Sequence, residues 1–352
     1  MLQNLTSTAA ATAQEQGAPA PDSEDARVWV RILANYREPS HARSVFELFI
    51  TLIPFLAIWA LALWGLSVSY LLAAALSVLN GLFLVRLFVI QHDCGHGSFF
   101  SNRLLNDWLG RALGVVTVTP YDVWRRTHAV HHASAGNLDK RGMGDVMTLT
   151  VREYQDLSRF GQLKYRLYRN PFVLFVLGPS YLFFLENRLP LGLMGAGWRY
   201  WVSAMGTNIV LAVVLGTLAY LGGLAAILLV FVPTVVVAAS IGVWLFYVQH
   251  QFEETCWDPD PEWQLHDAAL HGSSHYILPG ILRWFSANIG AHHVHHLQSR
   301  VPFYRLSEIL RDHPRLDQAQ RLTIRESISC VKLQLWDDQS RRLISFSEAK
   351  MV

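Results

Sequence analysis

The sequence predicts an all-α integral membrane protein with four transmembrane helices in two hairpins, interfacial or re-entrant helices, and a cytoplasmic cap rich in histidine. Of its 352 residues, 52% are hydrophobic and 16% are charged, against about 25% charged in ordinary soluble domains. Residues 48–85 and 200–252 contain no Asp, Glu, Lys or Arg, which is typical of segments that cross a bilayer. Grouped histidines lie just beyond these two stretches.

Each uncharged stretch is long enough to cross a membrane twice. As helices they would span about 57 Å and about 80 Å, whereas the hydrocarbon core is about 30 Å thick. Turns are expected at Gly65–Ser69 and at Gly222–Gly223, where glycine and serine interrupt the apolar pattern. The predicted spans are about 48–65, 69–91, 200–221 and 224–250.

Two shorter apolar segments are expected to stay at the membrane surface. Residues 170–185 are broken by Gly178–Pro179 and are short for a crossing, so we expect a re-entrant or interfacial segment. Residues 109–119 are also expected in the interface. Most Lys and Arg residues lie in 1–47, 92–170 and 300–352, so the positive-inside rule places both termini and the middle segment in the cytoplasm.

The rest of the composition gives the domain boundaries and excludes several classes of protein. Residues 1–40 are expected to be a disordered polar tail, because the first 26 lack the basic start and apolar core of a signal peptide. Residues 41–315 form the membrane domain and 316–352 a cytoplasmic tail. A net charge of +2 gives no basic bias toward nucleic acid. The three widely spaced cysteines form neither a disulfide framework nor a zinc motif.

Histidines occur in three motifs, HDCGH, HAVHH and HHVHH, and two of them share the spacing H-x-x-H-H. Residues at i, i+3 and i+4 share one helix face, so each H-x-x-H-H motif should present three imidazoles to one side. Eight imidazoles exceed the need of one ion, so two ions are expected, with a histidine at the end of the fourth span as a ninth ligand. The predicted ligands are His92, His96, His128, His131, His132, His250, His292, His295 and His296.

Other polar residues near the motifs are expected to orient the imidazoles. These candidates are Asp93, Asp122, Asp139, Asp145 and Asn288. His293 breaks the i, i+3, i+4 face of its own motif and is not predicted to be a ligand. The scattered histidines His41, His266, His271 and His313 are expected to be structural or solvated.

The three motifs and their surroundings resemble the histidine boxes of membrane fatty acid desaturases. The segment TPYDVWRRTHAVHHASAGNLDKRGMGD resembles the second-box region of acyl-lipid desaturases of the Δ12/ω6 type and of their bacterial Δ5 relatives. YVQHQFEETCW and SSHYILPGILRWFSANIGAHHVHHLQSRVPFYRL resemble the fourth-span and third-box regions of the same enzymes. The likeness covers residues 45–315.

The resemblance implies desaturation of the acyl chain of a membrane lipid, or of an acyl thioester, at a di-iron centre held by the nine histidines, with O2 as oxidant. It also implies an external electron donor such as ferredoxin or cytochrome b5, since no haem-binding HPGG segment is present. A bent acyl tunnel is expected, with Trp124, Trp284 and Phe285 as candidate lining residues. Basic residues that could dock an acidic ferredoxin or a lipid phosphate are Arg125, Arg126, Lys140 and Arg141.

Two alternatives remain at this stage. An acyl-chain hydroxylase or epoxygenase uses the same scaffold and the same first hydrogen abstraction, so the sequence separates it poorly from a desaturase. A membrane metal transporter or metal-binding protein belongs to another class. Transport would require polar groups along a path at bilayer depth, and residues 48–85 and 200–240 offer only Thr, Ser, Asn80 and Asn208.

Overall fold

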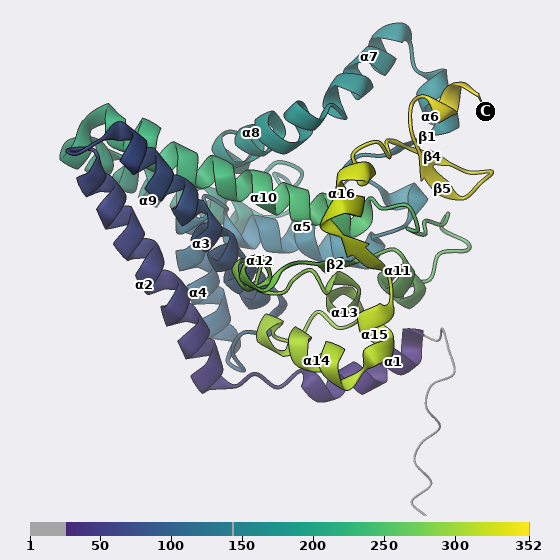
Figure 1. Cartoon of the computed structure of the whole chain (residues 1–352), viewed down its shortest axis with the longest axis horizontal. Helices are drawn as coiled ribbons and strands as arrows, with labels where there is room; N and C mark the ends of the chain where they lie inside the picture. The colour runs from purple at the N-terminus through teal and green to yellow at the C-terminus, as the bar shows by residue number, and fades with distance from the viewer. Residues whose placement is uncertain (1–25, 143, 352) are drawn as a thin grey trace, which may run out of the picture.

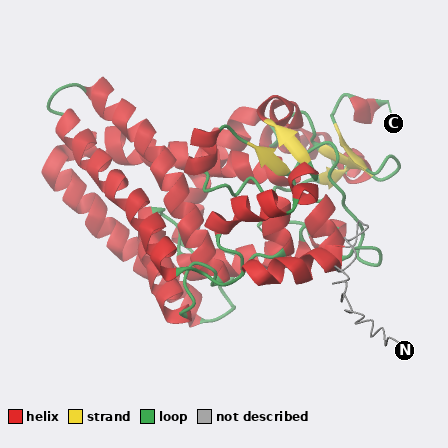
Figure 2. Ribbon diagram, turned by 60° about the horizontal axis from the view of Figure 1, so that its bottom comes forward, coloured by secondary structure: helices red, strands yellow, loops and turns green. Residues whose placement is uncertain are grey.

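The computed structural model describes residues 26–142 and 144–351, and most of them are helical (Figures 1 and 2). Three helices are long and apolar enough to cross a membrane. The first is α2 (His41–Gly65) and the second is α3 (Tyr70–His96). The third is a 53-residue stretch, Trp198–His250, built from α9 (Trp198–Ala225), the π-helix η5 (Ala226–Phe231) and α10 (Val232–His250).

The first two long helices pack against each other around the turn expected at Gly65–Ser69. The helix α2 begins after Ser40, whose side chain accepts a hydrogen bond from the Arg43 backbone. The helix α3 ends at Gly97, whose φ of 69° is a left-handed conformation that glycine adopts without strain. Exposed apolar side chains along the outer faces include Phe46, Ile53, Leu56, Trp64 and Leu71.

A buried ion pair joins the same two helices. The Arg86 guanidinium contacts the Glu47 carboxylate, and both side chains are 3% exposed. Arg86 also donates to Thr51 Oγ1 at 3.1 Å and to the Trp284 carbonyl. Because an unpaired buried charge is costly, this pair fixes the register of α2 on α3.

The third long stretch changes direction at the predicted glycines. Gly223 has φ 63° and ψ −163°, a combination essentially restricted to glycine. A Cβ on the neighbouring Gly222 would lie 3.6 Å from Leu66 Cδ1 in the turn after α2. The kink therefore lies beside the α2–α3 turn. Farther along, Val237 of α10 packs so closely on Gly81 of α3 that a Cβ there would clash.

The segment 170–185 runs along α10 as the π-helix η3 (Val173–Leu177) and α8 (Gly178–Phe184). The Phe175 ring lies 5.0 Å from Trp244 and 5.2 Å from Tyr247, and Phe184 lies 6.3 Å from Phe231. The segment therefore runs antiparallel to α10. The short helix η4 (Glu186–Arg188) follows, and Arg188 donates to Asn208 of α9 and to the Val118 carbonyl.

Two amphipathic helices connect α3 to the remainder of the chain. The helix α4 (Arg103–Val116) includes much of the segment expected at the membrane surface and exposes Leu104, Leu105 and Trp108. The helix α5 (Tyr121–Ser134) carries the second histidine motif. Tyr121 donates to the Cys94 carbonyl at 2.9 Å, which holds the start of α5 against the end of α3. Gly110 leaves room for the Tyr121 ring.

Short elements form the other side of the molecule (Figure 1). They include a three-stranded sheet of order β1-β4-β5 and a parallel pair β2-β3, in which His275 lies opposite Arg321. Figure 2 shows these strands in yellow. The bounds are η2 (Leu138–Lys140), β1 (Leu149–Thr150), α6 (Val151–Asp156), α7 (Arg159–Tyr168), α11 (Leu265–His271), β2 (His275–Ile277), α12 (Gly280–Phe285), α13 (His292–Leu297), η6 (Phe303–Arg305), α14 (Leu306–Asp312), α15 (Pro314–Gln318), β3 (Arg321–Thr323), α16 (Ile324–Cys330), β4 (Leu335–Asp337), β5 (Arg342–Ile344) and η7 (Glu348–Lys350).

The two terminal regions are more ordered than the sequence suggests. Residues 1–25 of the predicted polar tail lie outside the described residues, but the rest contains α1 (Ala26–Leu33) and η1 (Ala34–Tyr36). Trp29 and Leu33 on one face of α1 are buried, and the Trp29 ring packs on His313. The described part of the C-terminal region, 316–351, folds back so that β4 pairs with β1. The polar composition of these regions does not predict these contacts, because the contacts depend on only a few apolar residues.

Candidate metal centre

The structure gathers all nine predicted ligands into two groups, and within each group the ligand nitrogens lie within 4.8 Å of one another. They come from four helices: α3, α5, α10 and α13. The first group contains His92, His96, His128, His132 and His295. The second contains His131, His250, His292 and His296.

Each H-x-x-H-H motif divides its histidines between the two groups. On α5, the i, i+4 pair His128 and His132 joins the first group while His131 joins the second. On α13 the division is reversed: His292 and His296 join the second group and His295 the first. The three imidazoles that each motif is expected to present to one side of its helix are therefore shared between the two groups. The rings of His132 and His296 stack at 4.1 Å where the groups meet.

The ring nitrogens converge as they would around a shared cation. In the first group, Nε2 of His128 lies 3.0 Å from that of His96 and 3.1 Å from that of His132, which lies 3.1 Å from that of His295. Each Nε2 carries either one proton or one lone pair, so it cannot satisfy two such contacts by hydrogen bonding. The second group shows the same convergence at 3.0 and 3.1 Å. Such an arrangement fits metal ions of the kind that imidazole binds.

Burial keeps these imidazoles in the form that binds metal. It lowers the pKa of His128, His132, His292, His295 and His296 well below the usual value of 6.5, and neighbouring histidines lower it further. Desolvation disfavours the charged imidazolium, and adjacent charged rings would repel one another. These five side chains are therefore neutral near pH 7. The buried His131 Nε2 has no hydrogen-bond partner among the described residues, so its lone pair is free for an ion.

Three of the ligand rings have an oxygen acceptor at their second nitrogen, which fixes their orientation. Asp145 Oδ1 contacts Nδ1 of His131, and Asp93 Oδ1 lies 3.3 Å from Nδ1 of His92. The other Asp93 oxygen accepts from the Phe303 backbone at 2.7 Å. His250 Nδ1 lies 3.3 Å from the Gly272 carbonyl. Of the five candidate orienting residues, Asp93 and Asp145 thus contact the rings of predicted ligands.

The other three candidates for orienting residues bind different partners. Asp122 pairs with Arg111 at 2.9 Å and with Arg199 at 3.1 Å. Asp139 accepts from the Asp260 backbone, and Asn288 donates to Ser307 Oγ at 2.9 Å. His293 and His275, which lie outside both groups, each contact a backbone carbonyl at 2.9 Å, those of Leu316 and Asp317 respectively.

The aromatic residues proposed to line a tunnel lie at two places. The Trp124 ring stacks on His128 at 4.7 Å and 15°, directly against the first group. A Cβ on Gly95 would lie 2.8 Å from this indole, so only glycine permits the approach. Trp284 and Phe285 instead pack edge-on against Phe83 of α3, at 5.9 and 5.1 Å. Trp124 is therefore the candidate in contact with a predicted ligand.

Most of the basic residues proposed for docking are engaged in ion pairs. Arg125 pairs with Asp107 at 2.9 Å and Lys140 with Asp260 at 2.6 Å. Arg141 pairs with Glu153 at 2.7 Å. Arg126 is exposed. Their positive charge is thus partly neutralised within the chain.

The sequence did not single out Arg169, which is 2% exposed and lies beside the second group. Its guanidinium donates to the Met147 carbonyl, Thr148 Oγ1, Tyr247 Oη, Gln251 Oε1 and the Leu333 carbonyl, at 2.7–3.2 Å. It therefore joins the segment after Asp145, the end of α10 around His250, and the C-terminal region. A single arginine before an apolar segment carries no spacing signal that could have revealed this role.

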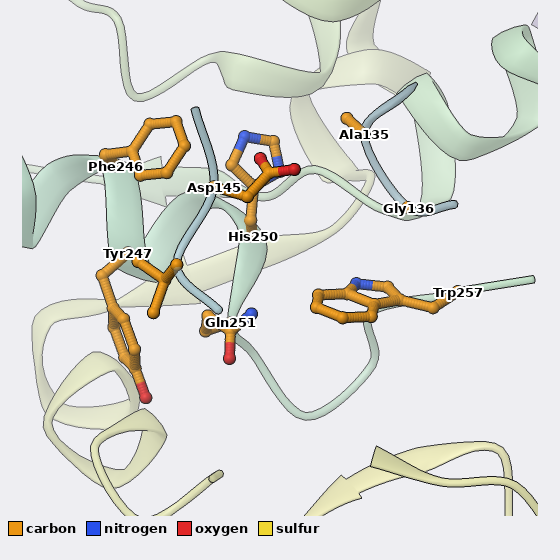
Figure 3. A pocket seen from close by; sticks show the side chains of 9 residues that line it. Ala135, Gly136, Asp145, Phe246, Tyr247, His250, Gln251 and Trp257 are labelled. Carbon is orange, nitrogen blue, oxygen red and sulfur yellow. The ribbon is translucent and has the colours of Figure 1, made fainter. Parts of the chain in front are cut away.

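Aromatic and polar side chains also surround His250 on the side away from the first group. The Phe246 ring lies 5.0 Å from that of His131 and 5.2 Å from that of His250. Figure 3 shows Phe246, Asp145 and His250 together along the wall of a small cavity.

Comparison with known proteins identifies the family of this chain. The sequence model of the family described as "Fatty acid desaturase" matches residues 69–327. The chain is 42% identical to a fatty acid desaturase of Bacillus subtilis over 320 residues, covering 91% of this chain and 90% of the relative. It is 27% identical to the sn-1 acyl-lipid omega-3 desaturase (ferredoxin) of Synechocystis sp., covering 78% and 76%. An omega-3 fatty acid desaturase of the endoplasmic reticulum of Vigna radiata is 29% identical, with 63% and 59% covered. The chain belongs to the fatty acid desaturase family, whose members include acyl-lipid desaturases.

Proposed function

We propose that this enzyme introduces a cis double bond into the acyl chain of a membrane lipid, with O2 as oxidant and two iron ions held by the two histidine groups. The observation that carries the proposal is the convergence of nine imidazoles into two adjoining groups, each with its nitrogens within 4.8 Å. Two adjoining sites rich in neutral nitrogen suit a pair of redox ions. The family to which the chain belongs supplies the reaction class.

The reaction requires a group that can attack an unactivated C–H bond, which offers no acidic proton. Overall, –CH2–CH2– plus O2, two electrons and two protons gives –CH=CH– plus two molecules of water. The iron ions would supply the oxidising chemistry. His92, His96, His128, His132 and His295 would hold one ion, and His131, His250, His292 and His296 the other.

The chain's own residues would position the ions and the substrate. Asp145, Asp93 and the Gly272 carbonyl orient three of the ligand rings, so the sites are shaped before metal binds. Trp124, which packs on both His128 and Phe88, offers an apolar surface beside the first group for an acyl chain. Five of the nine imidazoles are buried and the other four are partly buried, which would limit the access of bulk water to the reacting carbons.

Four membrane crossings in two hairpins are the arrangement we propose for the long helices. Supporting this, Ser203 near the start of α9 accepts a hydrogen bond from the Asp122 backbone of α5, and His250 ends α10 in the second histidine group. The kink at Gly222–Gly223 lies instead beside Leu66. Both ends of the 53-residue stretch thus lie near the histidines and its middle lies near the opposite turn. The histidine groups and both termini would face the cytoplasm, where basic residues are concentrated.

The substrate and the reductant are part of the same proposal. Exposed apolar side chains on α2, α4 and α9 would bring the enzyme into direct contact with lipid, which favours a membrane acyl lipid as substrate. An external one-electron carrier of the ferredoxin or cytochrome b5 type would supply the electrons. The printed name of the Synechocystis relative includes ferredoxin.

Expression in a host with saturated membrane lipids, followed by gas chromatography and mass spectrometry of the acyl chains, tests this function. The wild-type chain should produce a mono-unsaturated product and bind close to two iron ions. His131→Ala and His295→Ala, one from each group, should abolish the product while the protein still inserts into the membrane. His266→Ala, outside both groups, is the matched control. A hydroxylated product would favour the hydroxylase alternative, and full activity of either ligand variant would refute the site.

A further inference from the structure

A small chamber lies against the second histidine group and has no role in the function proposed above. Its walls include His250, Asp145, Phe246, Ala135, Gln251 and Trp257 (Figure 3). Its volume is about 20 Å³, slightly more than the roughly 10–15 Å³ that a single water needs. A water-sized molecule fits in this space, and an acyl chain does not.

A larger hollow lies on the other side of Trp257. It has a volume of about 380 Å³ and is lined by charged side chains, among them Arg141, Glu153, Asp338 and Arg341. Trp257 lines both spaces. Its ring is 7% exposed and stacks on that of Trp336 at 5.8 Å and 14°. The indole therefore forms a wall between a polar surface hollow and a chamber that touches a predicted metal ligand.

Unpaired polar groups in the chamber wall favour water as its occupant. The Gln251 Oε1 atom accepts from Arg169 and Thr148, but its Nε2 atom has no hydrogen-bond partner among the described residues. The indole N–H of Trp257 likewise has no partner within the described part of the chain. With the Asp145 carboxylate, these groups give a water the two or more polar partners that an ordered site requires.

We propose that this chamber and the outer hollow form a passage for water between the metal centre and the polar surface, with Trp257 as its gate. The proposal rests on the function given above, because desaturation produces two waters for each double bond in a site shielded from solvent. An acyl chain that fills an apolar tunnel would block the exit of water on its own side. A separate polar passage beside the second group lets water leave the site without crossing the acyl tunnel.

Azide, a small anion that binds ferric iron, measures access through such a passage. The iron-loaded protein in detergent is mixed with azide, and the association rate is followed by the new visible absorption. Trp257→Ala should accelerate association by about tenfold or more, which corresponds to lowering a barrier by about 1.4 kcal/mol. Ala135→Leu, which places a larger side chain in the chamber, should slow it. The dissociation constant for azide should change little in Trp257→Ala, because removing a gate raises the association rate and the dissociation rate by the same factor.

Two controls separate the passage from other effects. Trp108→Ala removes an exposed tryptophan of α4 and should leave the azide rate at the wild-type value. If Trp257→Ala fails to fold, Trp257→Phe and Ala135→Leu test the same passage with smaller changes. If azide binds the iron-loaded Trp257 and Ala135 variants at the wild-type rate, the proposed passage is refuted and the proposed function is unaffected. A wild-type chain that desaturates nothing and binds no iron would instead overturn the proposed function.

Discussion

Replacing Arg169 by methionine should destabilise the protein and weaken the second histidine group. Arg169 is 2% exposed and donates to five acceptors. Three of these acceptors keep another donor after the change: Gln251 Oε1 accepts from Thr148, the Leu333 carbonyl from Tyr247, and the Met147 carbonyl from Tyr165 at 3.5 Å. The other two, the hydroxyl oxygens of Thr148 and Tyr247, lose a charge-assisted bond with no other donor among the described residues to replace it.

The expected loss of stability follows from the number of hydrogen bonds that no other donor replaces. Charge-assisted hydrogen bonds contribute about 1.5–3 kcal/mol each, and the loss of the two that no other donor replaces is partly offset because a buried cation no longer has to be desolvated. We expect a net loss of about 3 kcal/mol in the free energy of unfolding, or about a 100-fold change in the folded-to-unfolded ratio. For a chain of this size, that lowers the unfolding temperature by about 4 °C.

Thermal unfolding of the iron-loaded protein in detergent, with iron measured in parallel, provides the assay. Arg169→Met should also lose iron, because Asp145 and His250 flank the segments that Arg169 holds together. Arg159→Met, an exposed arginine at the start of α7, is the matched control. If Arg169→Met unfolds at the temperature of the control and retains its iron, the inference that Arg169 positions this group fails.

Two further changes test the kink and the histidine groups. Gly223→Ala should lower the free energy of unfolding by about 1–3 kcal/mol, because a φ of 63° with a ψ of −163° strains any residue with a Cβ. Gly216→Ala, at a glycine with open space around it, is the control and should not lower stability. Equal unfolding temperatures for the two variants would contradict the kink at Gly223. For metal-free protein, acid should be destabilising, because the pKa values of His128, His132, His292, His295 and His296 are lower in the folded state than the unfolded value of 6.5. The unfolded chain then binds more protons below about pH 6.5, so stability is fully present above that pH and is lost as the pH falls. Unfolding temperatures of chelator-treated protein at about pH 8 and pH 5.5 measure this effect, and an equal or higher value at pH 5.5 would show that the sign is wrong.

The sequence predicted the local parts of the site better than the tertiary ones. Helical spacing placed His92 with His96 and His128 with His132, because those relations depend only on the pitch of one helix. The division of each H-x-x-H-H motif between two groups depends on how α5 and α13 approach each other, which no local pattern records. For the same reason, Asp122 was a reasonable candidate beside the second motif, yet Arg111 and Arg199 bind it.

The long helices show the same limit. Absence of charge over residues 48–85 and 200–252 predicted the apolar stretches, and glycine predicted where the second one bends. The packing of residues 170–185 along α10 could not be predicted, because it depends on ring contacts such as that of Phe175 with Trp244. The helix α1 was missed because two buried residues, Trp29 and Leu33, decide its docking within a polar composition.

The crossed contribution of α5 and α13 has a consequence for how the proposed pair of metal ions would be loaded. His131 and His295 each lie in the group opposite to that of the other two histidines of their motif. Neither proposed ion could therefore be fully coordinated unless both helices were already in register, and capture of the first would arrange the ligands of the second. Loading should then be all-or-none, with half-filled molecules scarce during maturation.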